Sequence, residues 1–237
     1  MKTFSKYCLV GAVISAANAA TVVQGWDSSI DFGVTLTRGN SETTLVTSTL
    51  ALSKIKGQDE YNAGLAYSFG DDGGSVITDE ITGFFNWNRL ATDTTYYGFR
   101  LEGRRDDIAE IDYRFQGTLL YGIYAIKNDK TTLAFEGGPG YTVESLDGED
   151  KTYPHFYIGQ RASHWMTDNT KLFQSLAAYG SLEDFSDHNL IFTLGVESMM
   201  NESLSLKVIL EDKYQSEPAD GAKQNDLKLI SGISYKF

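Results

Sequence analysis

The chain has 237 residues, of which 20 are basic and 32 are acidic, so its formal net charge is −12. This charge argues against a nucleic-acid partner, because neutralising phosphates requires Lys and Arg. The 41% hydrophobic and 13% aromatic content argues against a disordered chain, and the length suits one domain, or at most two. No stretch after residue 20 has the roughly 18 consecutive apolar residues of a membrane-spanning helix.

The N-terminus has the three-part layout of a secretory signal peptide. Lys2 and Lys6 form a basic start, Cys8–Ala17 is an apolar run, and Ala17-Asn18-Ala19 fits a cleavage site. We therefore expect residues 1–19 to be removed and residues 20–237 to form a single domain; a buried core helix is the alternative. Cleavage removes Cys8, the only cysteine, so the exported chain has no disulfide to stabilise it.

Apolar and polar residues alternate with a period of two along the rest of the chain, which is typical of β-strands with one apolar face. Near the start, Ile30 and Phe32 alternate with Asp31 and Gly33. Twelve such segments are predicted as strands: 26–37, 42–54, 59–69, 78–89, 95–105, 111–125, 130–145, 153–165, 170–181, 188–199, 204–214 and 225–237. Pro139 in the seventh segment removes a ladder donor and predicts a β-bulge there.

The connections between these segments alternate in length. The short set lies at 54–58, 90–94, 127–129, 166–169 and 200–203, and the longer, acidic set at 70–77, 106–110, 146–152, 182–187 and 215–224. The first connection, a Gly-Asn turn at 38–41, breaks this trend. An even number of antiparallel strands with short turns at one end and long loops at the other is the layout of a transmembrane β-barrel.

We therefore predict an all-β, antiparallel transmembrane β-barrel of twelve strands, with ten as the alternative, short periplasmic turns and longer acidic extracellular loops. A soluble β-sandwich or a lipocalin-like barrel also has alternating strands. The membrane barrel is favoured because the face opposite the apolar one carries Arg, Lys and Glu rather than a second apolar core. The physical reason for closure is that lipid offers no partner for an unpaired strand edge.

The C-terminal strand carries an expected assembly signal. Ile233, Tyr235 and Phe237 share one phase with Leu227 and Leu229, so we expect all of them to face lipid. A terminal Phe preceded by alternating aromatic and apolar residues resembles the signal by which the barrel-assembly machinery recognises outer-membrane proteins. The expected location is the bacterial outer membrane, and the expected partners are its lipids and, during biogenesis, that machinery. We expect a monomer.

The polar face should line the lumen of the barrel with charges of both signs. The strand phases place there Asp31, Arg100, Glu102, Arg104, Arg114, Glu136, Glu144, Glu197, Lys207, Glu211, Lys213, Lys228 and Lys236. Paired charges fit a filled lumen, because unpaired buried ions are costly, but a wide water-filled pore tolerates the same charges. Twelve strands set a diameter between the filled eight-stranded barrel and the open sixteen-stranded porin.

One lumen charge cluster is predicted in particular. Arg100, Glu102 and Arg104 recur at every second position of one strand, and Arg114 follows on the next strand in the same phase. An antiparallel register brings Arg104 close to Arg114, and two neighbouring cations need anions. We therefore predict that these four residues and Glu136 form one salt-bridged cluster close to the acidic rim formed by the long loops. Solvation of the loops is favoured over a specific cation site at this rim.

The sequence contains few candidate catalytic residues. The three histidines are His155, His164 and His188, and no metal-binding spacing of His or Cys and no phosphate-binding loop occurs. A lipid-facing Ser–His hydrolase site needs a serine in register with a histidine, and Ser175 across the turn from His164 is the one candidate. We expect no enzyme, no cofactor and no metal.

Several segments together resemble a known family. They are Gly33–Ser41, Leu101–Asp106 with Asp112–Arg114, Gly137–Tyr141, Ser181–Phe185, and Asp212–Pro218 with Asn225–Leu229. On these segments the sequence from Asp31 to Phe237 resembles the YdiY-like salt-induced outer-membrane proteins, a family whose domain is of unknown function. The resemblance implies an outer-membrane location and a β-barrel, and it supplies no reaction, ligand or functional residue.

Three classes of function stay open from the sequence. The first is a narrow channel or passive envelope component, which is based on the mixed-charge lumen. The second is a lipid-modifying enzyme built on a barrel, which rests on His164. The third is a soluble periplasmic protein that binds a ligand in its cavity. Lumen charges tune selectivity but do not identify a solute.

Overall fold

The computed structural model describes residues 25–37, 43–218 and 223–237. The predicted signal peptide at residues 1–19 and the predicted Gly-Asn turn at 38–41 lie outside the described residues. Within them, no helix has the length and apolar composition needed to cross a bilayer.

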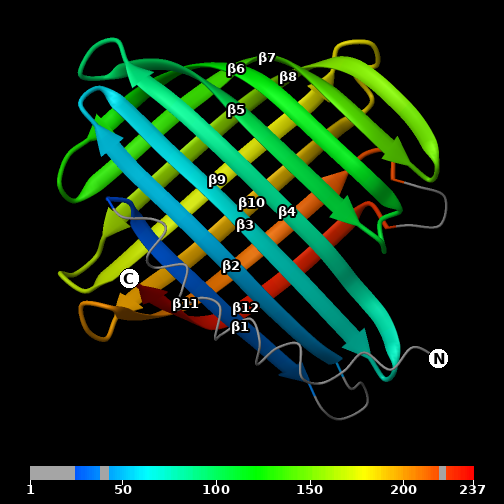
Figure 1. The fold of residues 1–237 in the computed structure, drawn as a ribbon, viewed down its shortest axis with the longest axis horizontal. Coiled ribbons are helices and arrows are strands. Elements are labelled where there is room, and N and C mark those ends of the chain that lie inside the picture. Colours follow the sequence, from blue (N-terminus) through cyan, green and yellow to red (C-terminus); the bar gives the residue numbers. More distant parts are fainter. Residues whose placement is uncertain (1–24, 38–42, 219–222) are drawn as a thin grey trace.

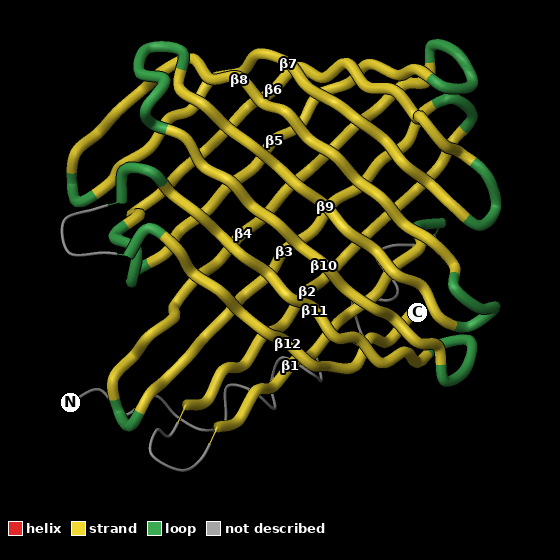
Figure 2. Tube along the Cα trace, turned by 180° about the vertical axis from the view of Figure 1, so that it is seen from behind, coloured by secondary structure: helices red, strands yellow, loops and turns green. Residues whose placement is uncertain are grey.

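Twelve antiparallel strands form one closed barrel, in which each strand pairs with its neighbours in sequence and β1 pairs with β12. The strands are β1 Asp27–Thr37, β2 Thr43–Lys56, β3 Asp59–Asp72, β4 Ser75–Leu90, β5 Thr95–Asp106, β6 Ile111–Lys127, β7 Thr131–Leu146, β8 Glu149–Trp165, β9 Thr170–Ser181, β10 His188–Met199, β11 Leu204–Gln215 and β12 Asn225–Lys236. Figures 1 and 2 show the strands of the near and far walls crossing obliquely. The predicted count of twelve is confirmed, and the ten-stranded alternative is wrong.

The outer surface of this barrel is apolar. On β6, the outward side chains of Phe115, Leu119 and Tyr121 are 60%, 67% and 64% exposed, whereas Arg114 and Thr118 on the inward phase are buried. The alternation read from the sequence therefore points apolar residues out and polar residues in. A water-soluble protein buries its large apolar side chains instead.

Two of the predicted long loops are tight turns. Strands β3 and β4 are joined by Gly73 and Gly74, and β7 and β8 by Asp147 and Gly148. All four residues have positive φ, between 53° and 99°. Two consecutive residues with positive φ are the requirement of a type I′ hairpin turn, which matches the twist of the flanking strands. Loop predictions at 70–77 and 146–152 were therefore too long, because the strands continue pairing up to these turns.

The β-bulge predicted at Pro139 is also wrong. Pro139 pairs in register with Phe156 on β8, and the register with β6 is the same on either side of it, from Thr118↔Gly140 to Tyr121↔Gly137. Because Pro139 has no backbone N–H to donate, the pairing of β7 with β6 is interrupted at this position, but neither strand contains an extra residue there. The register of that ladder shifts instead between Ile111 and Tyr113 and between Tyr124 and Ile126.

The barrel closes through a short seam. Five residue pairs join β1 to β12, from Ser29↔Lys236 to Gly33↔Gly232, whereas eleven pairs join β1 to β2. The backbone amide of Phe237 adds a hydrogen bond to the carbonyl oxygen of Ser28 at 3.1 Å. The outward side chains of Ile233 and Tyr235 are 48% and 50% exposed, and the rings of Tyr235 and Phe237 stack with centroids 6.4 Å apart.

Candidate functional site

The lumen divides into two halves that differ in the size of the inward side chains. We call the part lined by β5 to β9 the packed half and the part lined by β10 to β12 and β1 to β4 the open half. Inward positions of the packed half include Tyr96, Tyr157 and Tyr179, all at most 4% exposed. Small residues such as Thr49 and Ser68 take the corresponding positions on β2 and β3 and line a cavity.

Glu136 on β7 is the centre of the packed half. Its carboxylate accepts hydrogen bonds from the hydroxyl groups of Tyr96 at 2.6 Å and Tyr157 at 3.0 Å, and from the guanidinium of Arg161 at 3.1 Å. The guanidinium of Arg100 lies 4.0 Å from the same carboxylate. A side chain that is 2% exposed therefore has its charge compensated by cations and by neutral donors.

Glu102 connects β5 to β9 across the lumen of the packed half. The Arg100 guanidinium donates to its carboxylate at 2.8 Å, and the hydroxyl of Tyr179 donates to the other carboxylate oxygen. Because Glu102 lies on β5 and Tyr179 on β9, this contact spans the lumen between non-adjacent strands. The Arg100 guanidinium also lies over the ring of Tyr157, 5.6 Å from its centroid.

Glycines let the tyrosine rings lie close to the barrel wall. A Cβ atom at Gly122 would collide with the ring of Tyr96, and one at Gly159 would collide with the ring of Tyr157. The ring of Tyr96 therefore occupies the volume of a side chain on the neighbouring strand β6, and the ring of Tyr157 that of a side chain two residues further along β8. Close packing of this kind leaves no space for solvent beside the rings.

The buried histidine is part of this packing. His155 is 1% exposed, and its two ring nitrogens each lie 2.9 Å from a threonine hydroxyl, of Thr118 and of Thr142. The candidate dyad of His164 with Ser175 is wrong. The register pairs Ser175 with Arg161 and His164 with Leu172, so the serine lies on the inward phase and the histidine on the outward phase.

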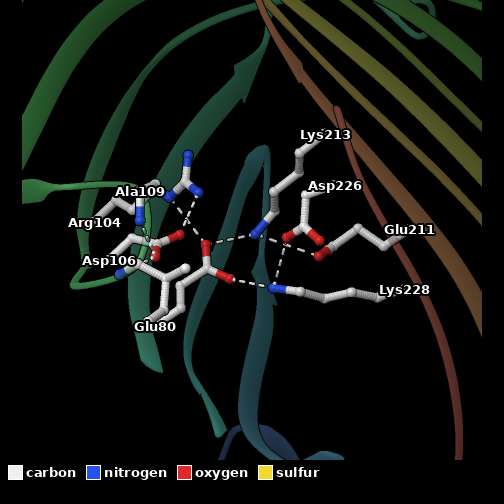
Figure 3. A network of polar contacts seen from close by, with 9 residues as sticks. Glu80, Arg104, Asp106, Ala109, Glu211, Lys213, Asp226 and Lys228 are labelled. Carbon is white, nitrogen blue, oxygen red and sulfur yellow. Dashed lines mark hydrogen bonds and ion pairs between the residues drawn. The ribbon is translucent and has the colours of Figure 1, made fainter. Parts of the chain in front are cut away.

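The open half is crossed by a second network, centred on Glu80 of β4 (Figure 3). Its carboxylate forms ion pairs with Lys213 at 2.6 Å, Arg104 at 2.9 Å and Lys228 at 2.9 Å. Lys213 and Lys228 come from β11 and β12, so these contacts join opposite walls close to the long-loop end. The outer partners of the three cations are Asp106, Glu211 and Asp226, at 2.7–3.3 Å.

The structure divides the predicted lumen charge cluster over three networks. Arg100, Glu102 and Glu136 lie together, and Arg104 and Arg114 are register partners, as the strand phases predict. However, Arg104 pairs with Glu80 and Asp106, and Arg114 pairs with Glu144, which also accepts from Tyr153 at 2.9 Å. In the described ranges, no ion pair joins Arg104 or Arg114 to Glu102 or Glu136, the two carboxylates that Arg100 contacts. A single cluster is therefore wrong, because each arginine has a carboxylate nearer than Glu136.

The sequence reading missed Glu80, Arg161 and the inward tyrosines. Glu80 lies on the alternating segment predicted at 78–89. The next residue, Ile81, is apolar and therefore favours the lipid-facing phase, which places Glu80 on the inward phase. In the structure Ile81 faces outward and is 42% exposed. The tyrosines were harder to assign, because an aromatic residue fits both the lipid face and a packed lumen.

The open half contains a cavity of about 170 Å³. Hydroxyl groups of Thr47, Thr49, Ser68, Thr82 and Thr193 line it, together with the charged side chains of Asp31, Glu80, Lys207, Glu211 and Lys213. Asp31 and Lys207 form an ion pair at 2.8 Å. On the inward phase of β4, Phe84 is 39% exposed, which indicates open lumen beside it. The open half can thus hold a small polar solute or water.

The long-loop rim uses several of its acids within its own turns. Asp106 is buried and accepts hydrogen bonds from the amides of Ile108 and Ala109 at 3.2 and 3.0 Å. Burial and the nearby carboxylate of Glu144 raise the pKa of Asp187 above its ordinary value. Among the described residues, no group of three or more His, Cys, Asp or Glu side chains could hold a metal ion.

Comparisons with known proteins agree with this architecture. A family described as "Protein of unknown function, DUF481" matches residues 30–237. None of the curated proteins compared with the chain matches it.

Several solved structures have a similar fold. The NanC porin is 9% identical with a TM-score of 0.55, covering 89% of this chain and 100% of that one. The COG4313 outer membrane channel from Pseudomonas putida F1 is 10% identical with a TM-score of 0.51, covering 90% and 95%. The translocator domain of autotransporter NalP from Neisseria meningitidis is 16% identical with a TM-score of 0.50, covering 97% and 95%. At these identities the likeness concerns the fold alone.

Proposed function

The chain belongs to the DUF481 family of proteins of unknown function, and within that family we propose that it acts as a narrow passive channel of the bacterial outer membrane. The observation that carries this proposal is the polar cavity of about 170 Å³ inside a closed barrel with an apolar outer surface. The path for solutes runs through the open half, because tyrosines and buried ion pairs fill the packed half.

The Glu80 network is the narrowest part of this path in our proposal. It links β4 to β11 and β12 across the open half, and it lies close to the long-loop end. Ion pairs that cross a lumen restrict the passage of solutes and set the local field that permeating ions meet. Because the long loops are acidic, cations gather at this entrance within about 8 Å at physiological salt.

Conductance in planar bilayers tests the proposal. The purified protein should give small, discrete conductance steps with a weak preference for cations in the reversal potential. Glu80→Gln removes the charge that holds Lys213 and Lys228 near β4, so we expect larger steps and a shift of the reversal potential toward anions. Glu102→Gln is the matched control in the packed half and should leave the step size unchanged.

The result that would contradict the proposal is a folded, membrane-inserted barrel without conductance steps. Heat-modifiable migration in gel electrophoresis reports folding independently of conductance. A conductance change of equal size in both variants would place the path along the whole lumen instead of in the open half.

The other two classes receive less support. The register partners of His164 in the described strands are Thr131 and Leu172, neither of which is a serine, and we propose that the chain is not an enzyme. A soluble periplasmic binding protein is disfavoured by outward residues such as Leu119 and Tyr121, which are more than 60% exposed. Cell fractionation distinguishes the soluble protein from the membrane barrel, and release of fatty acid from phospholipid vesicles tests for a lipid-modifying enzyme.

The remaining expectations belong to the same proposal. We propose that residues 1–19 are a cleaved signal peptide, that the barrel is a monomer in outer-membrane lipids, and that the barrel-assembly machinery inserts it through the strand ending in Phe237. Membership of the salt-induced YdiY-like group is part of the proposal too. Transcript levels before and after a rise in external salt test that membership without any assumption about transport.

A further inference from the structure

The cavity of the open half has an ion pair toward each end. Lys207 lies three residues from the start of β11 and pairs with Asp31, whereas Lys213 lies two residues from its end and pairs with Glu80. The two lysines are six positions apart, about 20 Å along the strand. The space between the pairs is lined on β2 to β4 by hydroxyl groups, so polar donors and acceptors face it along its length.

The charges around this cavity are nearly balanced. The charged lining residues, their ion-pair partners Arg104 and Lys228, and the outer partners of those two comprise four cations and five carboxylates: Arg104, Lys207, Lys213 and Lys228 against Asp31, Glu80, Asp106, Glu211 and Asp226. A solute with a single charge gains little there, because each opposite charge already has a partner, while the solute loses its own hydration. A solute that carries both charges can pair with both members of an opened ion pair.

The Asp31–Lys207 pair is the one best suited to open around such a solute. One carboxylate oxygen of Asp31 accepts from the Lys207 ammonium at 2.8 Å, and the other, Oδ1, is buried with no hydrogen-bond partner among the described residues. When a solute enters between the two side chains, its ammonium group donates a hydrogen bond to Oδ1 of Asp31. Its carboxylate then accepts a hydrogen bond from the ammonium of Lys207 in place of the Asp31 carboxylate. Both side chains are partly exposed to the lumen, at 22% and 16%, so a solute can reach the pair, and rotation of the Asp31 carboxylate as the pair opens brings Oδ1 to the solute.

Space for the solute is available beside this pair. Gly33 follows Asp31 on the same inward phase, and a Cβ atom there would lie 2.5 Å from the hydroxyl of Thr47 and 2.6 Å from Ile230. Gly33 therefore lets the side chains of Thr47 and Ile230 pack close to the backbone of β1, and these residues line the cavity together with Asp31. Thr49, which is the register partner of Asp31, supplies a further hydroxyl group.

We propose that the cavity of the open half is a binding site for small zwitterionic solutes, which bind with the ammonium at Asp31 and the carboxylate at Lys207. This inference rests on the proposed channel and names its solute class. The size of the cavity limits the class to small molecules, and the free amino acid glycine is its simplest member.

Swelling of proteoliposomes in isosmotic solutions tests the site, because it measures permeation of uncharged and zwitterionic solutes directly. Free glycine is compared with erythritol, a small neutral polyol. We expect glycine to enter about two- to fivefold faster than erythritol, which is the range of an exposed ion-pair contact. In Asp31→Asn/Lys207→Gln, we expect this ratio to fall to about one while swelling in erythritol continues.

The matched control removes a lumen ion pair that does not line the cavity. Lys171 and Glu197 pair at 3.3 Å on β9 and β10, and Lys171→Gln/Glu197→Gln should keep the wild-type ratio. A wild-type ratio of one or less, or an unchanged ratio in the Asp31/Lys207 variant, overturns the zwitterion site and leaves the channel standing. A folded protein without swelling in either solute overturns the channel itself, and the site with it.

Discussion

The two halves of the lumen are lined by strands of the same barrel but differ in the side chains that point into them. Both are built from strands with the same period of two, yet Tyr96, Tyr157 and Tyr179 fill the packed half, whereas Thr49 and Ser68 leave a cavity in the open half. The number of strands fixes the width of a barrel. The size of the inward side chains then determines how much of that width a solute can use.

The carboxylates of Glu136 and Glu144 in the packed half are drier than those of Asp31 and Glu211 beside the cavity, although Glu80 in the open half, at 4% exposure, and Glu102 in the packed half, at 20%, do not follow this division. In the packed half, the side chains of Glu136 and Glu144 are 2% and 3% exposed, whereas Asp31 and Glu211 in the open half are 22% and 26% exposed. Removing one member of a buried pair leaves an uncompensated charge in a dry site. The same change in a wet site exposes the partner to water and costs far less.

The largest effect is expected at the seam that closes the open half. Deleting Phe237 removes the last backbone hydrogen bond of β12 to β1, beside a seam of five residue pairs. It also removes the terminal aromatic residue of the proposed assembly signal. We expect most of the protein to fail to insert, as measured by the amount of heat-modifiable barrel in outer-membrane fractions.

Lys236→Gln is the control for this deletion. It changes the neighbouring inward residue, which is exposed, and leaves the outward aromatic residues in place. Insertion should stay at the wild-type level. Equal insertion of the two variants would mean that neither the seam nor the terminal aromatic residue limits assembly.

The next largest effect is expected in the packed half. Glu136→Ala leaves the guanidinium of Arg161 without its carboxylate and removes the acceptor for Tyr96 and Tyr157. The free energy of unfolding should fall by about 2–4 kcal/mol, because two buried tyrosine hydroxyls lose their acceptor, at about 1–3 kcal/mol each, whereas Arg161, which is 37% exposed, can be hydrated. Urea titration of the protein in lipid vesicles measures it, and Glu136→Gln should lose less because its amide oxygen still accepts from a tyrosine. A loss under about 1 kcal/mol for the alanine variant would mean that the packed half is wet.

A smaller effect is expected where a tyrosine ring lies on a glycine. In Gly122→Ala, the new Cβ atom meets the ring of Tyr96, which has to move away from Glu136. Overpacking of this kind typically costs about 1–3 kcal/mol. Gly180→Ala is the matched control, because a Cβ atom at Gly180 has no atom within 4 Å. Equal stability of the two variants would show that the ring of Tyr96 is free to rearrange.

The wall of the barrel could be predicted from the sequence, but the division of its lumen could not. Alternation places Arg100, Glu102 and Arg104 on the inward phase, and the structure has them there. Period-two patterns fix the face of each residue because a strand has only two faces. They carry no information on which inward residues meet across the lumen, so the contacts of Glu80 with Lys213 and of Glu102 with Tyr179 were not predictable.

The turns show the same limit at short range. Gly-Gly and Asp-Gly at 73–74 and 147–148 are typical of type I′ hairpins, but the acidic residues around them favoured longer loops. Charged residues at a strand end are compatible with either outcome, because the strands there extend into solvent. The positive φ values settle the matter in favour of tight turns.

The smallest effect on stability is expected in the open half, where it is paired with a change in transport. Asp31→Asn removes the carboxylate that pairs with Lys207 at 2.8 Å, but the freed ammonium is 16% exposed and faces a polar cavity. We expect the free energy of unfolding to fall by about 1 kcal/mol or less, as for solvent-exposed pairs. The reversal potential should shift toward anions, because one negative charge leaves the solute path. Glu144→Gln in the packed half is the matched carboxylate variant: it should lose more stability, since it is bound to Arg114 and Tyr153 in a dry site, and leave the reversal potential unchanged. If instead Asp31→Asn destabilises the barrel as strongly as Glu144→Gln does, the open half is as dry as the packed half, and the distinction between them fails.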